Sequence, residues 1–350
     1  MVKYFTGVWN SRKPHKEHLN VFLSLGDKIC VYDLGASGGT PPPFCWLLEG
    51  ISLINFEPDI RSELEGAGKS YTVAIGPPTL RTLYVNRRQT TSSLLPPCDD
   101  VVNRYDFARL FPREPRIFET LSTVDIETSG LDEVIKRLAL PPPDFLKIDV
   151  QGLTYEVLET GKETIAGSLL GLQAEVEFVE TYAGQKTFGS VHEYLEKQDF
   201  EIFRVTNLNH WPYKTSMPLK MYTGQDVFCD LLYLRSLRHV DRYPEFWTAR
   251  RIIQFVRICL LYDLTDAAAA YLERFIAKKL IDEKSVEGLA ELIRSWTGAL
   301  DYFYHPSAES HKGRTKKRLF FHACDLMLKS MLPDRVYNYL RSCIGRILPG

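Results

Sequence analysis

The chain has 350 residues, of which 45% are hydrophobic and 25% charged, and its formal net charge is −1. This balance is typical of an ordinary soluble globular protein and argues against a strongly basic or disordered chain. No run of about eighteen apolar residues occurs and residues 1–20 have no apolar signal core, so we expect no membrane span and a cytoplasmic location. Seven cysteines without a Cys-x-x-Cys pair predict reduced thiols and no structural zinc.

Residues 1–28 contain a short apolar piece, residues 19–25, that predicts a helix ahead of the first strand. We expect this segment either to cover the cleft above the sheet or to pack on the sheet edge. The first strand is Ile29–Leu34, which ends in the turn Gly35-Ala36-Ser37-Gly38-Gly39. Glycines at this point allow a tight turn into a helix, predicted around residues 44–48, whose free N–H groups face a ligand.

A second apolar run, residues 51–56, ends at Glu57, where an α/β unit places a carboxylate that accepts hydrogen bonds from ribose hydroxyls. The turn is not the Gly-x-Gly-x-x-Gly of a dinucleotide site, because Ser37 stands where bare backbone is needed. Asp33 near the end of the first strand suits a cationic ligand and repels a pyrophosphate. The pattern therefore favours S-adenosylmethionine over NAD.

The next segments predict the adenine side of the pocket. Residues 71–75 read as a third strand that brings Ala74 and Ile75 to the cofactor, and residues 79–86 and 121–126 read as accessory strands. The polar loop between them offers the hydroxyls of Ser92 and Ser93 to a ligand. The charged, proline-broken stretch 99–116 predicts a lid or a substrate element.

The second half of the α/β pattern predicts the rest of the sheet. Residues 145–148 form a buried strand that ends at Asp149, and residues 169–178 form the next strand, which carries Glu175. Helices are expected at 130–138, 153–165 and 191–198, and strands at 201–206 and 226–235. The last strand follows too short a connection for a crossover helix, so we expect it to be antiparallel. The loop 207–225, with His210, Trp211 and Tyr213, then hangs above the cofactor.

The last third differs in composition. Residues 239–350 are net basic and residues 1–238 net acidic, and apolar residues recur there at three- and four-residue spacing. We expect a helical bundle that begins near residue 239 and either pairs subunits or carries substrate. The basic run 311–318 is interpreted as a solvated connector, because the chain lacks the aromatic-basic interleaving of nucleic-acid surfaces.

Six segments in this order resemble the FkbM-type methyltransferases. They are Val31-Tyr32-Asp33-Leu34-Gly35-Ala36, Phe56-Glu57-Pro58, Ala74-Ile75-Gly76, Thr91-Ser92-Ser93-Leu94, Leu131-Asp132-Glu133, and Leu146-Lys147-Ile148-Asp149-Val150-Gln151-Gly152 with Tyr155-Glu156-Val157-Leu158. The resemblance covers roughly residues 29–235. It implies a class I, Rossmann-like, seven-stranded and mostly parallel sheet with one antiparallel strand, and an S-adenosylmethionine-dependent enzyme that usually methylates hydroxyl oxygens of sugars or secondary metabolites.

Three positions depart from the family pattern. Ser37 replaces an asparagine, Pro77 stands where an acidic residue often follows, and Gln151 replaces the glutamate of Asp-x-Glu-Gly. Ser37 can still donate and accept a hydrogen bond, whereas Pro77 removes a possible contact with the adenine amine. Gln151 removes a carboxylate beside Asp149, so we expect no metal site and a metal-independent reaction.

The sequence thus predicts a helical cover segment (1–28), a methyltransferase domain (29–238) and a helical domain (239–350). The expected cofactor-binding residues are Asp33, Gly35, Ala36, Ser37, Gly38, Glu57, Pro58, Ala74, Ile75 and Asp149. Asp149 and His210 are the leading candidates for a catalytic base, and Ser92, Ser93, Glu175, Trp211 and Tyr213 for substrate contacts. We expect a small-molecule or glycan substrate and no nucleic acid, with possible homo-oligomers through the C-terminal helices. The alternative is an inactive cofactor-binding scaffold whose helical domain binds a partner.

Overall fold

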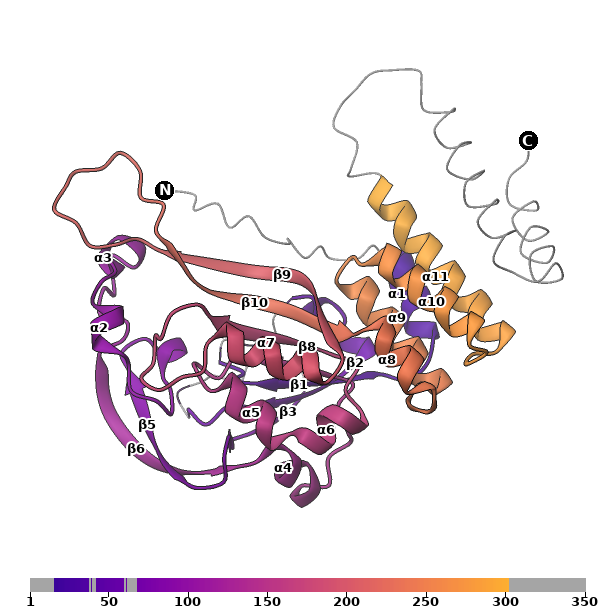
Figure 1. Ribbon diagram of the computed structural model, residues 1–350, viewed down its shortest axis with the longest axis horizontal. Coiled ribbons are helices and arrows are strands. Elements are labelled where there is room, and N and C mark those ends of the chain that lie inside the picture. Colours follow the sequence, from indigo (N-terminus) through magenta and orange to yellow (C-terminus); the bar gives the residue numbers. More distant parts are fainter. Residues whose placement is uncertain (1–15, 38, 40–41, 60, 62–67, 302–350) are drawn as a thin grey trace. The chain divides into compact units, whose positions relative to one another are not determined.

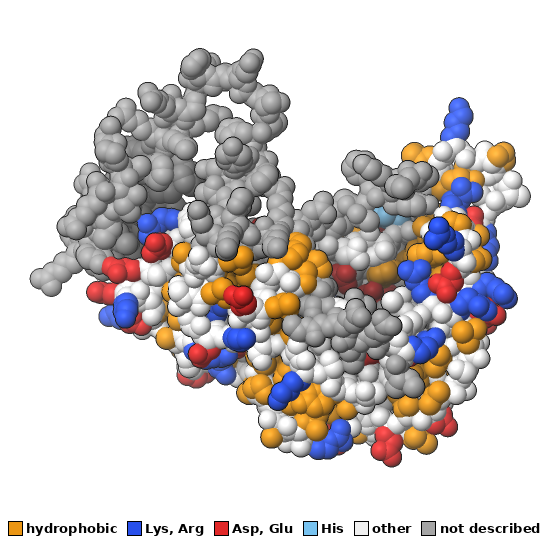
Figure 2. All heavy atoms as spheres, turned by 180° about the vertical axis from the view of Figure 1, so that it is seen from behind, with side chains coloured by type: hydrophobic (Ala, Val, Ile, Leu, Met, Phe, Trp, Pro, Cys, Tyr) orange, Lys and Arg blue, Asp and Glu red, His pale blue; other side chains and the backbone are white. Residues whose placement is uncertain are grey.

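The computed structural model describes residues 16–37, 39, 42–59, 61 and 68–301 (Figure 1). The chain divides into two compact units, Met1–Gly298 and Ala299–Gly350. The basic run 311–318 and the part of the expected helical bundle that follows residue 301 lie outside the described residues. Within the described part, no helix is long and apolar enough to cross a membrane. On the face in Figure 2, described side chains of both charges are interspersed with hydrophobic ones.

The main sheet has the architecture predicted from sequence. Its strands are β1 (Ile29–Leu34), β2 (Ile51–Phe56), β3 (Lys69–Tyr71), β7 (Phe145–Ile148), β8 (Gly171–Glu177), β9 (Phe200–Trp211) and β10 (Gln225–Arg235). They lie in the order β3-β2-β1-β7-β8-β10-β9. β10 is antiparallel to β8 and β9, and the other neighbouring strands are parallel. The carboxyl ends of β1, β2, β7 and β8 therefore meet at one edge of the sheet.

Both faces of the sheet are buried, because alternate residues of each strand point to opposite sides. In β1, Ile29 and Val31 belong to one apolar cluster, and Cys30 and Tyr32 belong to the other. The second cluster is completed by α4 (Leu131–Arg137), α5 (Thr154–Thr160), α6 (Lys162–Gly167) and α7 (Phe188–Lys197). The first cluster is completed by α1 (Lys16–Ser24), α8 (Leu237–Arg242), α9 (Ala249–Leu261), α10 (Thr265–Ala277) and α11 (Glu283–Asp301).

The helices that follow residue 238 are joined to the sheet by polar contacts as well as by this cluster. Arg250 of α9 donates to both carboxylate oxygens of Asp144, at 2.7 and 2.8 Å, and Asp144 also accepts from the backbone N–H of Cys30 at 2.9 Å. Phe22 of α1 packs 5.8 Å from Trp296 of α11, between ring centroids. Residues 239–298 therefore cover one face of the sheet. The predicted division into a cover segment (1–28), a methyltransferase domain (29–238) and a helical domain (239–350) remains a prediction.

A smaller sheet and two short helices lie beside the edge of the main sheet where the carboxyl ends of β1, β2, β7 and β8 meet. β4 (Ala74–Ile75), β5 (Leu80–Asn86) and β6 (Thr120–Ser129) pair in the order β4-β6-β5. Between β5 and β6 lie α2 (Asp99–Val102) and α3 (Phe107–Leu110). This excursion contacts the β9–β10 hairpin: Asp106 N–H donates to Pro212 O at 2.7 Å, and Lys214 N–H to Arg104 O at 2.8 Å. Figure 1 shows α3 beneath the hairpin.

Three expected elements differ in the structure. Among the described residues 42–50, two 3₁₀ turns, Phe44–Trp46 and Leu48–Gly50, stand where the sequence predicts an α-helix. The expected third strand, 71–75, is divided between β3 of the main sheet and β4 of the small sheet. The expected helix 153–165 is interrupted at Gly161 and becomes α5 and α6.

Candidate active site

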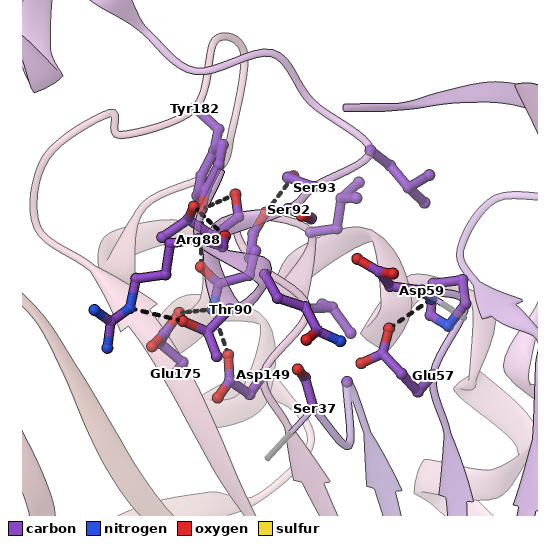
Figure 3. A pocket seen from close by; sticks show the side chains of 18 of the residues that line it. Ser37, Glu57, Asp59, Arg88, Thr90, Ser92, Ser93, Asp149, Glu175 and Tyr182 are labelled. Atoms are coloured by element: carbon purple, nitrogen blue, oxygen red, sulfur yellow. Dashed lines mark hydrogen bonds between the residues drawn. The ribbon is translucent and has the colours of Figure 1, made fainter. Parts of the chain in front are cut away.

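A cavity of about 430 Å³ opens over the carboxyl ends of β1, β2, β7 and β8. Figure 3 shows Glu57 and Asp59 on one side of it and Asp149 and Glu175 on the other. Its lining includes Gly35, Ser37, Glu57, Pro58, Ala74, Ile75, Ser92, Ser93, Asp149, Glu175, Glu177 and Trp211. Most of the residues that the sequence assigns to a ligand thus meet around one space.

Glu57 follows β2 directly and is 7% exposed. Its Oε1 accepts a hydrogen bond from the backbone N–H of Asp59 at 2.8 Å, which fixes the carboxyl at the cavity wall. Burial raises the pKa of Glu57 to about 7, although the bond from Asp59 acts in the opposite direction. A carboxylate held in this way can accept hydrogen bonds from two neighbouring hydroxyls of a ligand.

Three strand ends converge at Gly35. Its backbone N–H donates to Phe56 O at 2.9 Å, and Asp149 N–H donates to Leu34 O at 2.9 Å. Gly35 has a φ of +82°, and a Cβ on it would lie 1.8 Å from the carbonyl oxygen of Asp149. A side chain at this position is excluded by both conformation and space, so glycine is required for β1 and β7 to meet at the cavity floor.

Asp33 lies beneath the cavity and not in its lining. It is 1% exposed, and its register partner in β7 is Lys147, whose Nζ lies 3.2 Å from Asp33 Oδ1. Burial raises the pKa of Asp33 while Lys147 lowers it. Burial alone would lower the pKa of Lys147. The nearby carboxyls raise it instead, and they belong to Asp33, Asp149 and Asp230. Lys147 is thus a buried cation that balances carboxylates under the site.

Above this pair, a network of side chains joins the ends of β7 and β8. Gln151 Nε2 donates to Asp149 Oδ1 at 2.6 Å and to Glu175 Oε1 at 3.1 Å. Its Oε1 accepts from Tyr182 OH at 2.8 Å, and Lys147 Nζ lies 3.5 Å from Asp149 Oδ2. Gln151 has a φ of +49°, which is uncommon for a residue with a side chain. The amide therefore occupies the space between the two carboxylates.

Glu177 is the last residue of β8 and lines the same cavity at 3% exposure. The backbone N–H of Gly152 donates to its carboxyl. Burial raises the pKa of Glu177 to about 8, and it raises the pKa of Glu175 well above its ordinary value. Burial thus makes ionisation of both β8 carboxyls less favourable, because charge is costly where water is excluded.

An apolar wall faces these carboxyls. Phe111, Phe118, Trp211 and Phe228 line the cavity, and the Trp211 ring packs 5.5 Å from Phe118 and 5.9 Å from Phe228, between centroids. These residues come from the excursion between β5 and β6 and from the β9–β10 hairpin. The two segments therefore form one side of the cavity, as the sequence predicts for a lid or substrate element.

Comparison with known proteins identifies the domain that holds this site. Residues 42–202 match the family model of the methyltransferase FkbM domain. The match covers just under half of the chain. The resemblance expected from the sequence motifs is thereby confirmed, and S-adenosylmethionine is the cofactor. No curated protein sequence matches the chain.

Solved methyltransferase structures are also similar. A precorrin-6y C5,15-methyltransferase from Geobacter metallireducens is 12% identical, with 65% of this chain and 94% of that chain covered at a TM-score of 0.28. A magnesium protoporphyrin IX methyltransferase from Synechocystis, solved with bound S-adenosylmethionine, is 10% identical, with 63% and 77% covered at a TM-score of 0.27. The strand order of the main sheet, with its single antiparallel strand β10, is that of a class I methyltransferase.

Five expected site residues, Asp33, Ala36, Gly38, His210 and Tyr213, are not among the residues that line the cavity. Asp33 is paired below it, Ala36 is buried without lining it, and Gly38 is outside the described residues. His210 lies on β9 between two lining residues, Asn209 and Trp211. Since neighbouring strand residues point to opposite faces, its ring is directed away from the cavity, where its Nδ1 pairs with Asp226. The structure therefore does not bring His210 to the reaction site.

The hairpin is longer than the sequence suggests, which explains the position of His210. β9 continues to Trp211 because Gln225 and Asp226 of β10 pair with Trp211 and His210. Tyr213 follows the strand and is 48% exposed, with its OH donating to Gln225 Oε1 at 2.6 Å. Only Trp211 of the expected hairpin residues lines the cavity, and Tyr213 does not.

The two serines expected to contact substrate are engaged by the protein itself. Ser93 Oγ donates to Gln151 O at 2.6 Å, and Ser92 Oγ accepts from Asn86 N–H at 3.1 Å and from Arg61 Nη2 at 3.0 Å. Both line the cavity. Their hydroxyls hold the loop 89–95 against the end of β7.

Sequence reasoning missed Glu177 and the bridging role of Gln151. Glu177 stands two residues after Glu175 on a predicted strand, so both had to share one face. That spacing was the available signal. No signal in the sequence indicated that Tyr182 would reach Gln151.

Proposed function

We propose that this protein is a metal-independent O-methyltransferase that transfers the methyl group of S-adenosylmethionine to a hydroxyl of a sugar, glycan or secondary metabolite. The observation that carries the proposal is the division of the cavity into a Glu57 end and a carboxyl-rich end beside an aromatic wall. A cofactor that spans the first part leaves the second part for an acceptor.

At the cofactor end, we propose that Glu57 accepts from the ribose hydroxyls, that Ala74 and Ile75 contact the adenine, and that Gly35 and Ser37 contact the methionine part. The lining fits such a group, because a buried carboxylate, a bare backbone turn and small apolar side chains follow one another along the strand ends. Pro58 and Asp149 complete this set. When bound, the cofactor supplies an electrophilic methyl group on a positively charged sulfur.

At the acceptor end, Glu175, Glu177 and Trp211 face the remaining space. Carboxyls accept hydrogen bonds from hydroxyls, and an aromatic face packs against the C–H surface of a sugar. Gln151 fills the space between Asp149 and Glu175 with an amide. An amide NH₂ group donates to both carboxylates in place of a cation, which supports a reaction without a metal.

The test is an acceptor screen with labelled S-adenosylmethionine, in the presence and absence of a chelator. We expect label in a hydroxylated product and the same rate with chelator. A strict need for Mg²⁺ would refute the metal-independent reaction, and transfer only to nitrogen or carbon would refute O-methylation. Cofactor binding without turnover on any acceptor would favour the scaffold alternative. A cytoplasmic location and subunit pairing through the C-terminal helices remain predictions.

A further inference from the structure

We propose that the carboxyl of Glu177 faces the site of methyl transfer and takes the proton of the acceptor hydroxyl. This inference rests on the proposed function and adds the identity of the base. It starts from the position of Glu177 at the last residue of β8, where its buried side chain lines the cavity.

Glu177 has a buried carboxyl oxygen without a hydrogen-bond partner among the residues that the structure describes, whereas Asp149 and Glu175 are both engaged by Gln151. The oxygen without a partner is Oε2 of Glu177. Asp149 is held by Gln151 and lies near Lys147, and Glu175 accepts from the same Gln151 amide. A buried carboxyl oxygen without a partner is costly, and an acceptor hydroxyl in the cavity would satisfy it.

The order of the strands places Glu177 at the correct end of the cavity. Glu57 follows β2, and β1, β7 and β8 succeed it across the sheet. Glu177 therefore lies three strand spacings, about 14 Å, from the proposed ribose site. The methionine end of the cofactor and the acceptor share the interval between these two carboxyls.

The proposed step is balanced by groups already named. An acceptor oxygen forms a bond to the methyl carbon, the carbon–sulfur bond breaks, and its electron pair stays on sulfur. The acceptor O–H proton passes to Glu177, which changes from carboxylate to carboxylic acid. A base near neutral pKa suits such a transfer, and burial raises the pKa of Glu177 to about 8. The titratable groups around it are Asp149 directly after β7, Glu175 on β8, Cys229 and Asp230 on β10, and Tyr182.

A binding experiment tests the position of Glu177 without a known acceptor. Sinefungin carries a protonated amine in place of the methyl-bearing sulfonium, whereas S-adenosylhomocysteine has no group there. We expect the wild type to prefer sinefungin, and Glu177→Gln to reduce this preference at least about tenfold, because a charge-assisted hydrogen bond is lost. The matched control Glu175→Gln should change the preference less than about threefold, since the Glu175 carboxyl is already engaged by the Gln151 amide.

Calorimetric affinities for both ligands separate the possible results. Loss of the preference in Glu177→Gln alone supports the proposal, and an unchanged preference in a folded variant that binds both ligands overturns it. Loss in Glu175→Gln alone also overturns it and transfers the role to Glu175. If the wild type binds neither ligand, the proposed function itself fails.

The wild-type protein provides a second measurement if Glu177→Gln does not fold. The preference for sinefungin should rise with pH and approach its maximum above about pH 8, as Glu177 ionises. A preference that is independent of pH across this range would overturn the proposal.

Discussion

Glu57 offers the sharpest test of how the cofactor is held, because its ionisation falls in an accessible pH range. Burial raises its pKa to about 7, so the free protein contains both forms near neutrality. If the carboxylate form accepts from the ribose hydroxyls, affinity should rise with pH and reach a plateau above neutrality. At about pH 6 only about a tenth of Glu57 is ionised, which predicts an affinity about tenfold below that plateau.

The probe should not titrate in the same range. 5′-Methylthioadenosine has the ribose and adenine but neither the amino acid nor the sulfonium charge, so calorimetry with this ligand reports on Glu57. Glu57→Ala should weaken binding by about 1.5–3 kcal/mol, which is about 10- to 150-fold in Kd. Glu57→Gln should bind weakly at every pH in the range.

Asp59→Asn is the matched control. Asp59 holds Glu57 through its backbone N–H, which the substitution keeps, and its side chain pairs with Arg61. The charge of Asp59 contributes to the raised pKa of Glu57, so its loss should move the titration to lower pH without abolishing it. The pH dependence should therefore survive in this variant. Equal affinities of wild type and Glu57→Ala would refute the role of Glu57 at the ribose, and a pH dependence that persists in Glu57→Gln would assign the titration to another group.

Three further predictions concern stability and the reaction. Gly35→Ala should lower the free energy of unfolding by at least about 3 kcal/mol in denaturant titrations, since its Cβ would lie 1.8 Å from Asp149 O. The control is Gly189→Ala, whose Cβ meets nothing within 4 Å. This variant should be neutral or stabilising by less than about 1 kcal/mol. Asp144→Ala should cost about 1.5–3 kcal/mol by the same measurement, because it removes hydrogen bonds to a guanidinium, and no change would show that α9 is held by apolar contacts alone. His210→Ala should keep cofactor affinity and turnover near the wild-type values. A turnover rate about 10²-fold below wild type would instead show that His210 acts at the reaction site.

The predicted site residues that the structure brings to one cavity depend on local patterns. Gly35, Glu57 and Asp149 each follow a short apolar strand directly, and parallel strands bring their ends to one edge wherever the chain runs between them. Strand alternation and the order of elements were sufficient to predict the sheet, including its antiparallel strand.

Structure and expectation differ where distant pairing decides the outcome. Asp33 lies beneath the cavity, paired with its register partner Lys147, which is more than a hundred residues away. His210 is directed outward because β10 extends β9 beyond the predicted strand end. The helix expected after the glycine turn is replaced by 3₁₀ turns next to Pro43. No single-sequence pattern contains these pairings.

The shared cluster of β1 and α9 has a consequence for synthesis of the chain. Ile29 and Val31 leave the ribosome about 220 residues before Phe255, the residue of α9 that packs in the same cluster. At ordinary translation speeds this interval is on the order of ten seconds or more. During most of that time α1 is the one helix of this cluster that has been made, because α8 begins only at Leu237. Most of this face of the nascent sheet therefore stays exposed to water until the later helices follow.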